Sequence, residues 1–195
     1  NQGALLAYAT LLSEQLSTKV RGMLDFTHIE SGVLALDRRK HDVGKLVSQV
    51  CDTQGILAQN SNVTLVKELQ VKLRSANCDD EKIGQVLNYF LTAAIQNSSP
   101  GAEIKVSASN KPGDNQVKDQ VQVSVRSDNS KVQEEDLNIL FHKNGKPVNP
   151  KNVKLQETVL NLAIAKRIIE AHGGLFWIGP KEGKAIQYNF SLPAA

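Results

Sequence analysis

The sequence predicts an α+β fold, in which a mixed sheet of about five strands carries helices on one face and one long helix precedes this two-layer α/β sandwich. Long segments repeat apolar residues every three or four positions and end at turn-forming residues, as amphipathic helices do. Shorter segments alternate apolar and polar residues, as strands do. With 41% hydrophobic residues among 195, the chain has enough apolar side chains to form a core.

The first helix is predicted for residues 4–29, where an apolar stripe follows one helix face. The stripe includes Leu5, Leu12, Leu16, Val20 and Met23. An apolar face of this length needs a partner surface, and we expect that partner to be a second copy of the same helix, which makes the chain a homodimer. Packing against its own domain is the alternative. A charged linker follows, so residues 1–41 are assigned to a dimerisation helix with its linker.

The second domain, residues 42–195, is predicted to contain both helices and strands. Asp42 is the expected N-cap of its first helix, and Asp79 or Asp80 is the expected N-cap of the next. The predicted helices span 43–59, 80–98, 134–141 and 160–172, and the predicted strands span 62–69, 103–108, 121–126, 175–179 and 185–192.

Composition and spacing argue against several classes of function. A formal net charge of +3 does not indicate a nucleic-acid partner, and no apolar run is long enough to cross a bilayer, so we expect neither nucleic-acid nor membrane contact. Cys51 and Cys78 lack the spacing of metal ligands and are expected to be free buried thiols in a reducing, cytoplasmic compartment. No catalytic triad, carboxylate pair or metal cluster is recognisable, so we predict no catalytic residue and no metal site. The chain begins at Asn1 rather than Met, and we expect it to be part of a longer protein.

Three segments together resemble the C-terminal part of a sensor histidine kinase. They are MLDFTHIESGVLALDRRKHDVGKLV, DDEKIGQVLNYFLTAAIQNSSPGAEIKVSA and LAIAKRIIEAHGGLFWIGPKEGKAIQYNFSLP. The first resembles the end of the dimerisation helix and its linker, and the second resembles the helix with the family's asparagine box and the strand after it. The third is similar to the last helix and hairpin of the ATP-binding domain. The resemblance implies the Bergerat-like fold of the gyrase, Hsp90, histidine kinase and MutL superfamily.

The residues that bind Mg-ATP in the resembled family are exchanged in this sequence. Ala93 stands where the family has the asparagine that holds Mg²⁺, and a methyl group cannot coordinate a hard cation. The other exchanged positions are Ser127, Asn129 and Lys131 in the Asp-x-Gly-x-Gly motif, Glu157, Val159 and Asn161 in the phosphate loop Gly-x-Gly-x-Gly, and Ala185 in the terminal turn. Asp128 lies one residue late, which on an extended segment turns its side chain to the other face. We therefore expect that ATP and Mg²⁺ binding is lost, that no cofactor is held, and that residues 157–161 continue the last helix towards its N-terminus.

The resemblance also places the family's phosphoacceptor His-Glu pair upstream of this sequence, and it implies that His172 ends a helix, where it favours the C-terminal dipole. Together these features predict a pseudokinase that is not an enzyme and that acts as a non-catalytic signalling scaffold derived from a sensor histidine kinase. Its expected partners are a second copy of the chain and a response regulator or partner kinase. Two alternatives stay open: an active kinase with rewired nucleotide contacts, and a small-molecule sensor that reuses the cleft.

Overall fold

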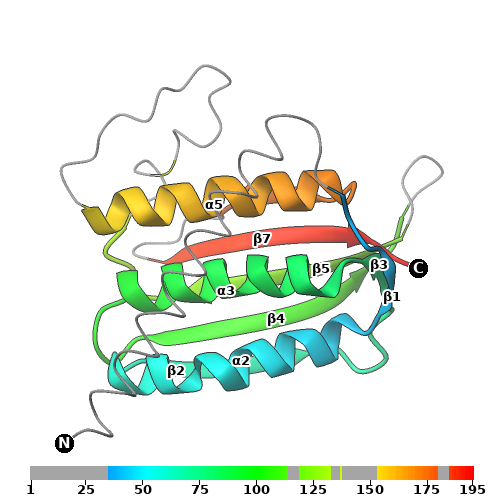
Figure 1. Cartoon of the computed structure of the whole chain (residues 1–195). Helices are drawn as coiled ribbons and strands as arrows, with labels where there is room; N and C mark the ends of the chain where they lie inside the picture. The colour runs from blue at the N-terminus through cyan, green and yellow to red at the C-terminus, as the bar shows by residue number, and fades with distance from the viewer. Residues whose placement is uncertain (1–34, 114–118, 133–136, 138–152, 180–184) are drawn as a thin grey trace, which may run out of the picture. The chain divides into compact units, whose positions relative to one another are not determined.

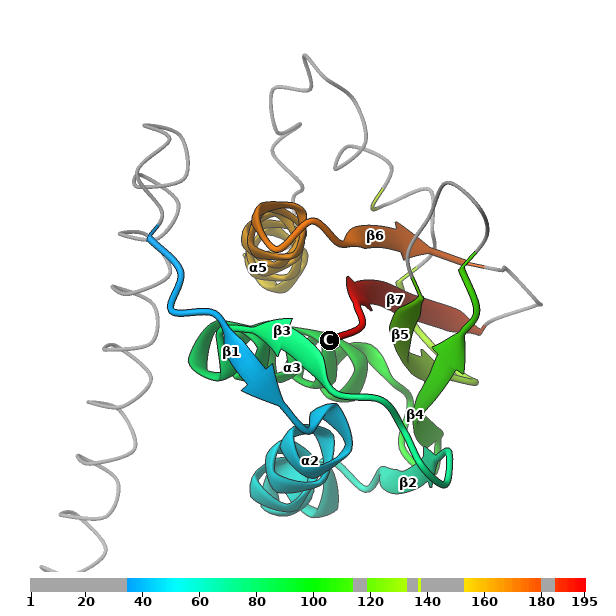
Figure 2. The ribbon, with the colours of Figure 1, turned by 90° about the vertical axis from the view of Figure 1, so that its right-hand side faces the viewer.

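A computed structural model of the chain describes residues 35–113, 119–132, 137, 153–179 and 185–195. Within them, a five-stranded sheet in the order β2-β4-β5-β7-β6 carries the helices α2, α3 and α5 on one face (Figures 1 and 2). This arrangement confirms the predicted α+β sandwich. The residues expected at the dimer interface, and nearly all of the short helix expected at 134–141, lie outside the described residues.

The sheet is mixed, as predicted. The strand β2 (Thr64–Leu69) runs parallel to β4 (Glu103–Lys111), and the other neighbours, β4 with β5 (Gln120–Ser127), β5 with β7 (Ile186–Pro193) and β7 with β6 (Leu175–Ile178), are antiparallel. Alternate residues of a strand face the same side of a sheet. One buried row across the sheet consists of Val106, Val125 and Tyr188, which are partners in register.

The helix α3 (Asp80–Asn97) lies between α2 and α5 and packs against the sheet (Figure 2). Phe90 of α3 contacts the rings of Phe176, Tyr188 and Phe190, with ring centroids 5.6, 5.6 and 5.8 Å away. Tilted and edge-on aromatic pairs of this kind stabilise a core beyond the apolar area that they bury. The aromatic part of the core therefore lies between α3 and the strands β6 and β7.

Two aspartates begin helices at the predicted positions. Asp42 Oδ1 accepts a hydrogen bond of 3.1 Å from the Lys45 amide at the start of α2 (Val43–Asn60). Asp79 Oδ1 accepts one of 3.0 Å from the Lys82 amide at the start of α3. Each carboxylate satisfies an amide that has no partner in the first helical turn. The sequence left Asp79 and Asp80 as alternatives, and the structure assigns the N-cap to Asp79.

Part of the segment that we expected to be a charged linker forms a strand. The strand β1 (Arg39–His41) pairs antiparallel with β3 (Ala76–Cys78), and the two form a separate two-stranded sheet. The three residues of β1 are all basic or titratable and show no apolar alternation. Strand formation here depends on the pairing partner, which the local sequence pattern does not reveal.

The last helix, α5 (Val153–Ala171), begins at Val153 rather than at Leu160. The three positions that replace the glycines of the family's phosphate loop, Glu157, Val159 and Asn161, therefore lie within the helix, as we expected. No glycine or proline interrupts this segment, so nothing in its local sequence opposes the helix.

A glycine pair ends α5 and turns the chain into β6. Gly173 has a φ of 75°, a left-handed conformation that side chains disfavour. Gly174 lies so close to β7 that a Cβ atom there would be 2.1 Å from the carbonyl oxygen of Ser191. The close approach of the two backbones explains why the sequence has glycine at this position.

Candidate functional site

The helices α3 and α5 lie side by side (Figure 1). They run antiparallel, because one hydrogen bond joins the start of α3 to the end of α5 and another joins the end of α3 to the start of α5. At one end, Asn97 Nδ2 donates to Thr158 Oγ1 over 3.1 Å, and both side chains are buried. At the other end, the Asp79 amide donates to His172 Nε2 over 3.1 Å. These two contacts fix the helices against each other over the length of α3, which is about 27 Å at 1.5 Å per residue.

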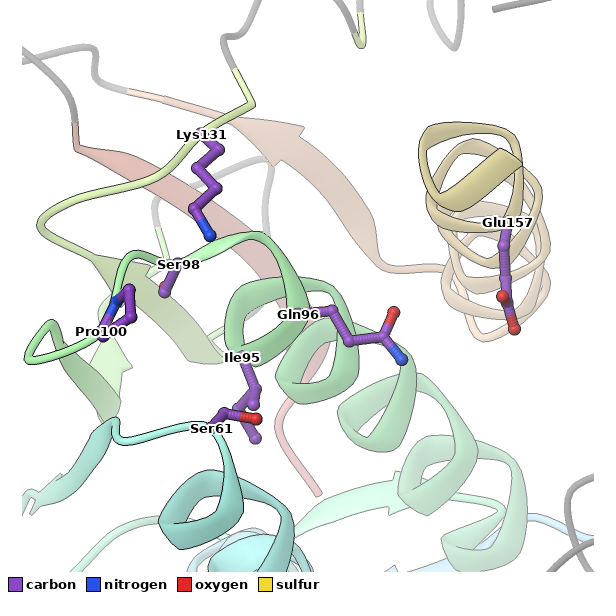
Figure 3. A pocket seen from close by; sticks show the side chains of 7 residues that line it. All are labelled: Ser61, Ile95, Gln96, Ser98, Pro100, Lys131 and Glu157. Carbon is purple, nitrogen blue, oxygen red and sulfur yellow. The ribbon is translucent and has the colours of Figure 1, made fainter. Parts of the chain in front are cut away.

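A pocket of about 290 Å³ lies at the C-terminal end of α3 (Figure 3). In Figure 3, the Lys131 side chain extends from the segment after β5 towards Ser98, and Gln96 extends from α3 towards α5, where Glu157 lies. The lining residues are Ser61, Ile95, Gln96, Ser98, Pro100, Lys131 and Glu157. The pocket thus brings together two of the exchanged positions, Lys131 and Glu157, which are far apart in the sequence.

The position of the expected metal ligand carries no metal-binding group. The Ala93 side chain is buried, and its carbonyl oxygen accepts a hydrogen bond of 2.8 Å from Asn97 Nδ2. Asn97 Nδ2 also donates to Thr158, so the NH2 group of its side chain is engaged within the protein. The other nearby asparagine, Asn88, accepts a hydrogen bond of 3.0 Å from Gln54 of α2. Neither asparagine occupies position 93, where the resemblance places the metal ligand.

The position of the expected adenine acceptor is occupied by a buried hydroxyl. Ser127 is 0% exposed, and its Oγ lies 2.6 Å from Ser98 Oγ. Because Ser98 donates its own proton to the Ala94 carbonyl over 2.6 Å, Ser127 is the donor in the serine pair. The carboxylate of Asp128, one residue later, lies on an exposed residue. The end of β5 is therefore bonded to the end of α3, and Asp128 does not take the place of Ser127.

Backbone hydrogen bonds strengthen the same junction. The Asn129 carbonyl accepts from the Ser99 amide over 2.9 Å, and the Lys131 amide donates to the Asn97 carbonyl over 2.7 Å. All three exchanged positions of this motif are thus part of the connection between β5 and α3, although the Asn129 and Lys131 side chains are exposed.

The α5 positions offer no open phosphate loop. The amides of residues 157–161 come after the first four residues of the helix. Amides at these later positions donate to carbonyl groups of the preceding turn, so they cannot bind a ligand. Glu157, Val159 and Asn161 are half-buried, and the carboxylate of Glu157 would repel an anion at the pocket. The last exchanged position, Ala185, is half-buried just before β7.

These contacts test whether Mg-ATP fits the described residues, and the contact set that the resemblance implies is not present. A methyl group lies at the metal position, a bonded hydroxyl at the adenine position and a helix at the phosphate position. Within the described ranges, no three His, Cys, Asp or Glu side chains lie close enough together to hold a metal ion. In the same residues, no helix is long and apolar enough to cross a bilayer.

His172 directly follows the last residue of α5 and has a structural role, as expected, but this role does not depend on the helix dipole. Burial lowers the pKa of His172 below its usual value, against the opposing effect of its hydrogen bond to Ile168, so the ring is neutral near pH 7. A neutral ring carries no positive charge that could interact favourably with the dipole at the C-terminus of the helix. Its Nδ1 lies 2.7 Å from the Ile168 carbonyl and its Nε2 binds the Asp79 amide, so the residue acts through two hydrogen bonds.

Asn97, Thr158 and Ser98 close this end of α3, and none of them was predicted from the sequence to do so. A weak signal existed, because Asn97 and Ser98 directly follow the apolar face of a predicted helix, where buried polar residues need partners. Their partners lie 61 and 29 residues further along the chain, and no local pattern identifies them.

Comparison with known proteins gives consistent matches. The family model described as histidine kinase-, DNA gyrase B- and HSP90-like ATPase matches residues 78–195. The sensor histidine kinase WalK of Bacillus subtilis is 24% identical over 181 residues, which are 93% of this chain and 29% of WalK. The adaptive-response sensory kinase SasA of Synechococcus elongatus is 23% identical over 92% of this chain and 44% of SasA. This chain therefore spans less than half the length of either relative.

Solved structures share the fold. Full-length ShkA, crystallised in complex with AMPPNP, matches 97% of this chain and 38% of its own with a TM-score of 0.74 and 22% identity. The histidine kinase AdeS of Acinetobacter baumannii matches 96% of this chain and 83% of its own with a TM-score of 0.70 and 21% identity.

The comparisons contradict the prediction that this chain is not an enzyme. The matching family is one of ATPases, and the relatives are named sensor or sensory kinases. The exchanges at positions 93, 127 and 157 change residues that the resemblance assigns to contacts with Mg-ATP. The absence of such a contact does not show that catalysis is lost. The prediction was wrong because it took missing contacts to mean missing activity.

Proposed function

The chain belongs to the family of histidine kinase-, DNA gyrase B- and HSP90-like ATPases, and from this membership we propose that it is the ATPase-like module of a two-component sensor histidine kinase whose nucleotide site has diverged. In this proposal the described conformation binds Mg-ATP weakly, with a dissociation constant of roughly millimolar or higher. The module passes on signals through its dimer and its protein contacts.

The observation that carries the proposal is the pair of side-chain hydrogen bonds at the C-terminal end of α3. One joins Asn97 to Thr158 of α5, and the other joins Ser98 to Ser127 of β5. A nucleotide bound between these elements would have to replace contacts that the protein already makes with itself. The loss of one charge-assisted hydrogen bond costs about 1.5–3 kcal/mol, and about 1.4 kcal/mol is a factor of ten in affinity. Losing two or three such contacts takes a micromolar site to roughly millimolar.

A second candidate function is an active kinase whose nucleotide contacts are rewired, and the pocket supplies one observation in its favour. Lys131 lines the pocket, and an ammonium group can bind a phosphate as a point charge. Glu157 lines the same pocket and opposes this attraction. The two candidates differ in one measurable quantity, the affinity of the unmodified chain for Mg-ATP.

Thermal unfolding with and without Mg-ATP or Mg-ADP separates the two candidates. A ligand far below its dissociation constant stabilises a fold hardly at all, whereas one at about 100 times that constant adds about 2.7 kcal/mol. We expect no shift in Tm at millimolar Mg-ATP for the unmodified chain. We expect none for Ala93→Asn alone either, because residues 157–161 remain helical in that variant. An upward shift of several degrees that Lys131→Ala removes, together with label retained from radioactive ATP, would favour the second candidate and overturn the first.

A variant with the family's residues restored at the exchanged positions tests whether these positions cause the weak binding of Mg-ATP. Glycine at positions 157, 159 and 161 weakens the first turns of α5 by about 0.5 kcal/mol per residue relative to Glu, Val and Asn. Combined with Ala93→Asn and Ser127→Asp, it should bind Mg-ATP more tightly than the unmodified chain does. Equal affinity of the two proteins for Mg-ATP would show that the residues at positions 93, 127, 157, 159 and 161 are not the cause of weak binding.

The partners and compartment are part of the same proposal. The apolar stripe of residues 4–29 forms the homodimer, and a response regulator or partner kinase binds the assembly in the cytoplasm. The free, buried Cys51 and Cys78 support a reducing compartment. Replacing Leu12 and Leu16 by glutamate should give a folded monomer in light scattering, and a monomeric unmodified chain at micromolar concentration would refute the dimer.

A further inference from the structure

The residues just before β1 lie against the ends of two helices. The Asp37 amide donates to Asp79 Oδ2, at the start of α3, over 3.1 Å. The Arg38 guanidinium donates to the Ala171 carbonyl, at the end of α5. The strand β1 then pairs with β3, directly before Asp79. The segment 36–41, which we call the entry segment, is therefore held by contacts to both helices and to β3.

His172 positions the carboxylate that holds this segment. Its Nε2 accepts a hydrogen bond of 3.1 Å from the Asp79 amide, so this nitrogen carries no proton. Its Nδ1 lies 2.7 Å from the Ile168 carbonyl, an acceptor, so this nitrogen carries the proton. The two contacts require the neutral ring with its proton on Nδ1. The ring is 2% exposed, so water cannot replace either partner.

A second proton on His172 is incompatible with this arrangement. A proton on Nε2 turns the acceptor into a donor that faces the donating Asp79 amide. Of the charged groups from the packed elements, Arg38 of the entry segment opposes the second proton and Asp79 of α3 favours it. Cys78 of β3 stays neutral, because burial raises the pKa of its thiol to about 11. Burial has the largest effect of all and also opposes the second proton, so the pKa of His172 is lowered.

We propose that His172 is a pH-sensitive latch, whose protonation separates it from Asp79 and frees the entry segment from the ends of α3 and α5. The released state exposes the ring to water, where it takes up the proton at its ordinary pKa of about 6.5. The latch therefore contributes fully above about pH 6.5 and weakens as the pH falls below that value towards the lowered pKa of the closed state. This inference rests on the latch contacts and is independent of Mg-ATP affinity.

The experiment is amide hydrogen exchange of the whole chain at pH 7.5 and pH 5.5, expressed as protection factors corrected for the intrinsic effect of pH. We follow the entry-segment amides and use residues 121–126 of β5 as the internal reference. At pH 5.5, one unit below the pKa of about 6.5 of an exposed histidine, the population of the open state rises about tenfold relative to a closed state that takes up no proton. The expected result is a fall of about tenfold in protection of the entry segment, with β5 unchanged.

Substitutions separate the latch from other effects of acid. His172→Gln keeps an acceptor for the Asp79 amide and cannot titrate, so the entry segment should stay protected at both pH values. His172→Phe removes the acceptor, so the segment should be poorly protected at both. The matched control is His41→Gln, which replaces the histidine of the entry segment itself, whose Nδ1 lies 3.7 Å from Asp80 Oδ2. This variant should keep the full response to acid.

Two results would overturn the latch. One is an unmodified chain whose entry segment is equally protected at both pH values. The other is a fall in protection that persists in His172→Gln. If His172→Phe also loses protection in β5, the variant has unfolded, and the comparison of the unmodified chain with His172→Gln decides the question alone.

Discussion

Removing one buried hydroxyl should stabilise this domain. Tyr188 lies in β7 with 0% of its surface exposed, and its ring packs against Phe90. Among the residues that the structure describes, its hydroxyl has no hydrogen-bond partner. Burial raises the pKa of Tyr188 above its usual value, so the hydroxyl is neutral near pH 7. The substitution Tyr188→Phe keeps the ring and removes only the unpaired group.

The size of the effect follows from two opposing contributions. A buried polar group without a partner costs about 1–3 kcal/mol. Its removal leaves a void of about one oxygen atom, which costs a few tenths of a kcal/mol at about 24 cal/mol per Å³. The free energy of unfolding should therefore rise by about 1 kcal/mol, which for a domain of this size raises Tm by roughly 2–4 °C.

A matched tyrosine provides the control. Tyr89 of α3 is also buried, but its hydroxyl accepts a hydrogen bond of 2.9 Å from Gln85 Nε2. Tyr89→Phe removes a made bond and should lower the free energy of unfolding by about 0.5–1.5 kcal/mol. Urea unfolding, followed by circular dichroism, measures both variants against the unmodified chain. A Tyr188→Phe variant that loses more than about 1 kcal/mol would refute the reasoning, because it would show that the hydroxyl has a partner.

Two further predictions concern the backbone and the thiols. Gly174→Ala should lower the free energy of unfolding by about 2 kcal/mol or more, because its Cβ would lie 2.1 Å from the Ser191 carbonyl oxygen. Gly55→Ala, within α2 and with nothing within 4 Å of its Cβ, should raise it by about 0.5–1 kcal/mol, and a reversal of this order in urea unfolding would contradict the geometry. Burial raises the pKa of Cys51 and of Cys78 to about 11, so both thiols are protonated at pH 8. Iodoacetamide should label them slowly in the folded chain and rapidly in urea, and fast labelling of the folded chain, detected by mass spectrometry, would show that they are exposed.

The regular elements could be predicted because their signals are local. The helix expected at 80–98 is α3 (Asp80–Asn97), and the strand expected at 121–126 is β5 (Gln120–Ser127). In each case the period of the apolar residues matches the period of the backbone, and a capping aspartate or a turn marks the boundary. The strand β1 was missed, since three polar residues carry no period and form a strand only beside β3.

The candidate site was predicted only in part. The resemblance identified the positions that differ from the family, and the structure has Glu157, Val159 and Asn161 in a helix as expected. The conclusion that the chain is not an enzyme was wrong, because it passed from missing contacts to missing activity, and the comparisons with named kinases contradict it. The loss of Mg-ATP binding stays a prediction until affinity is measured.

By itself, the sequence determined the fold class, the starts of α2 and α3, and the buried faces of α3, β4, β5 and β7. These depend on the order of apolar and polar residues over a few positions, and that order is fixed in the chain before it folds. Only the tertiary structure decided that Asn97 meets Thr158 and that Asp79 meets His172, across 61 and 93 residues of sequence. A polar side chain has the same appearance in a sequence whatever it will contact. Its partner is set by the packing of whole helices, which arises from the summed burial of many apolar groups and not from the polar pair itself.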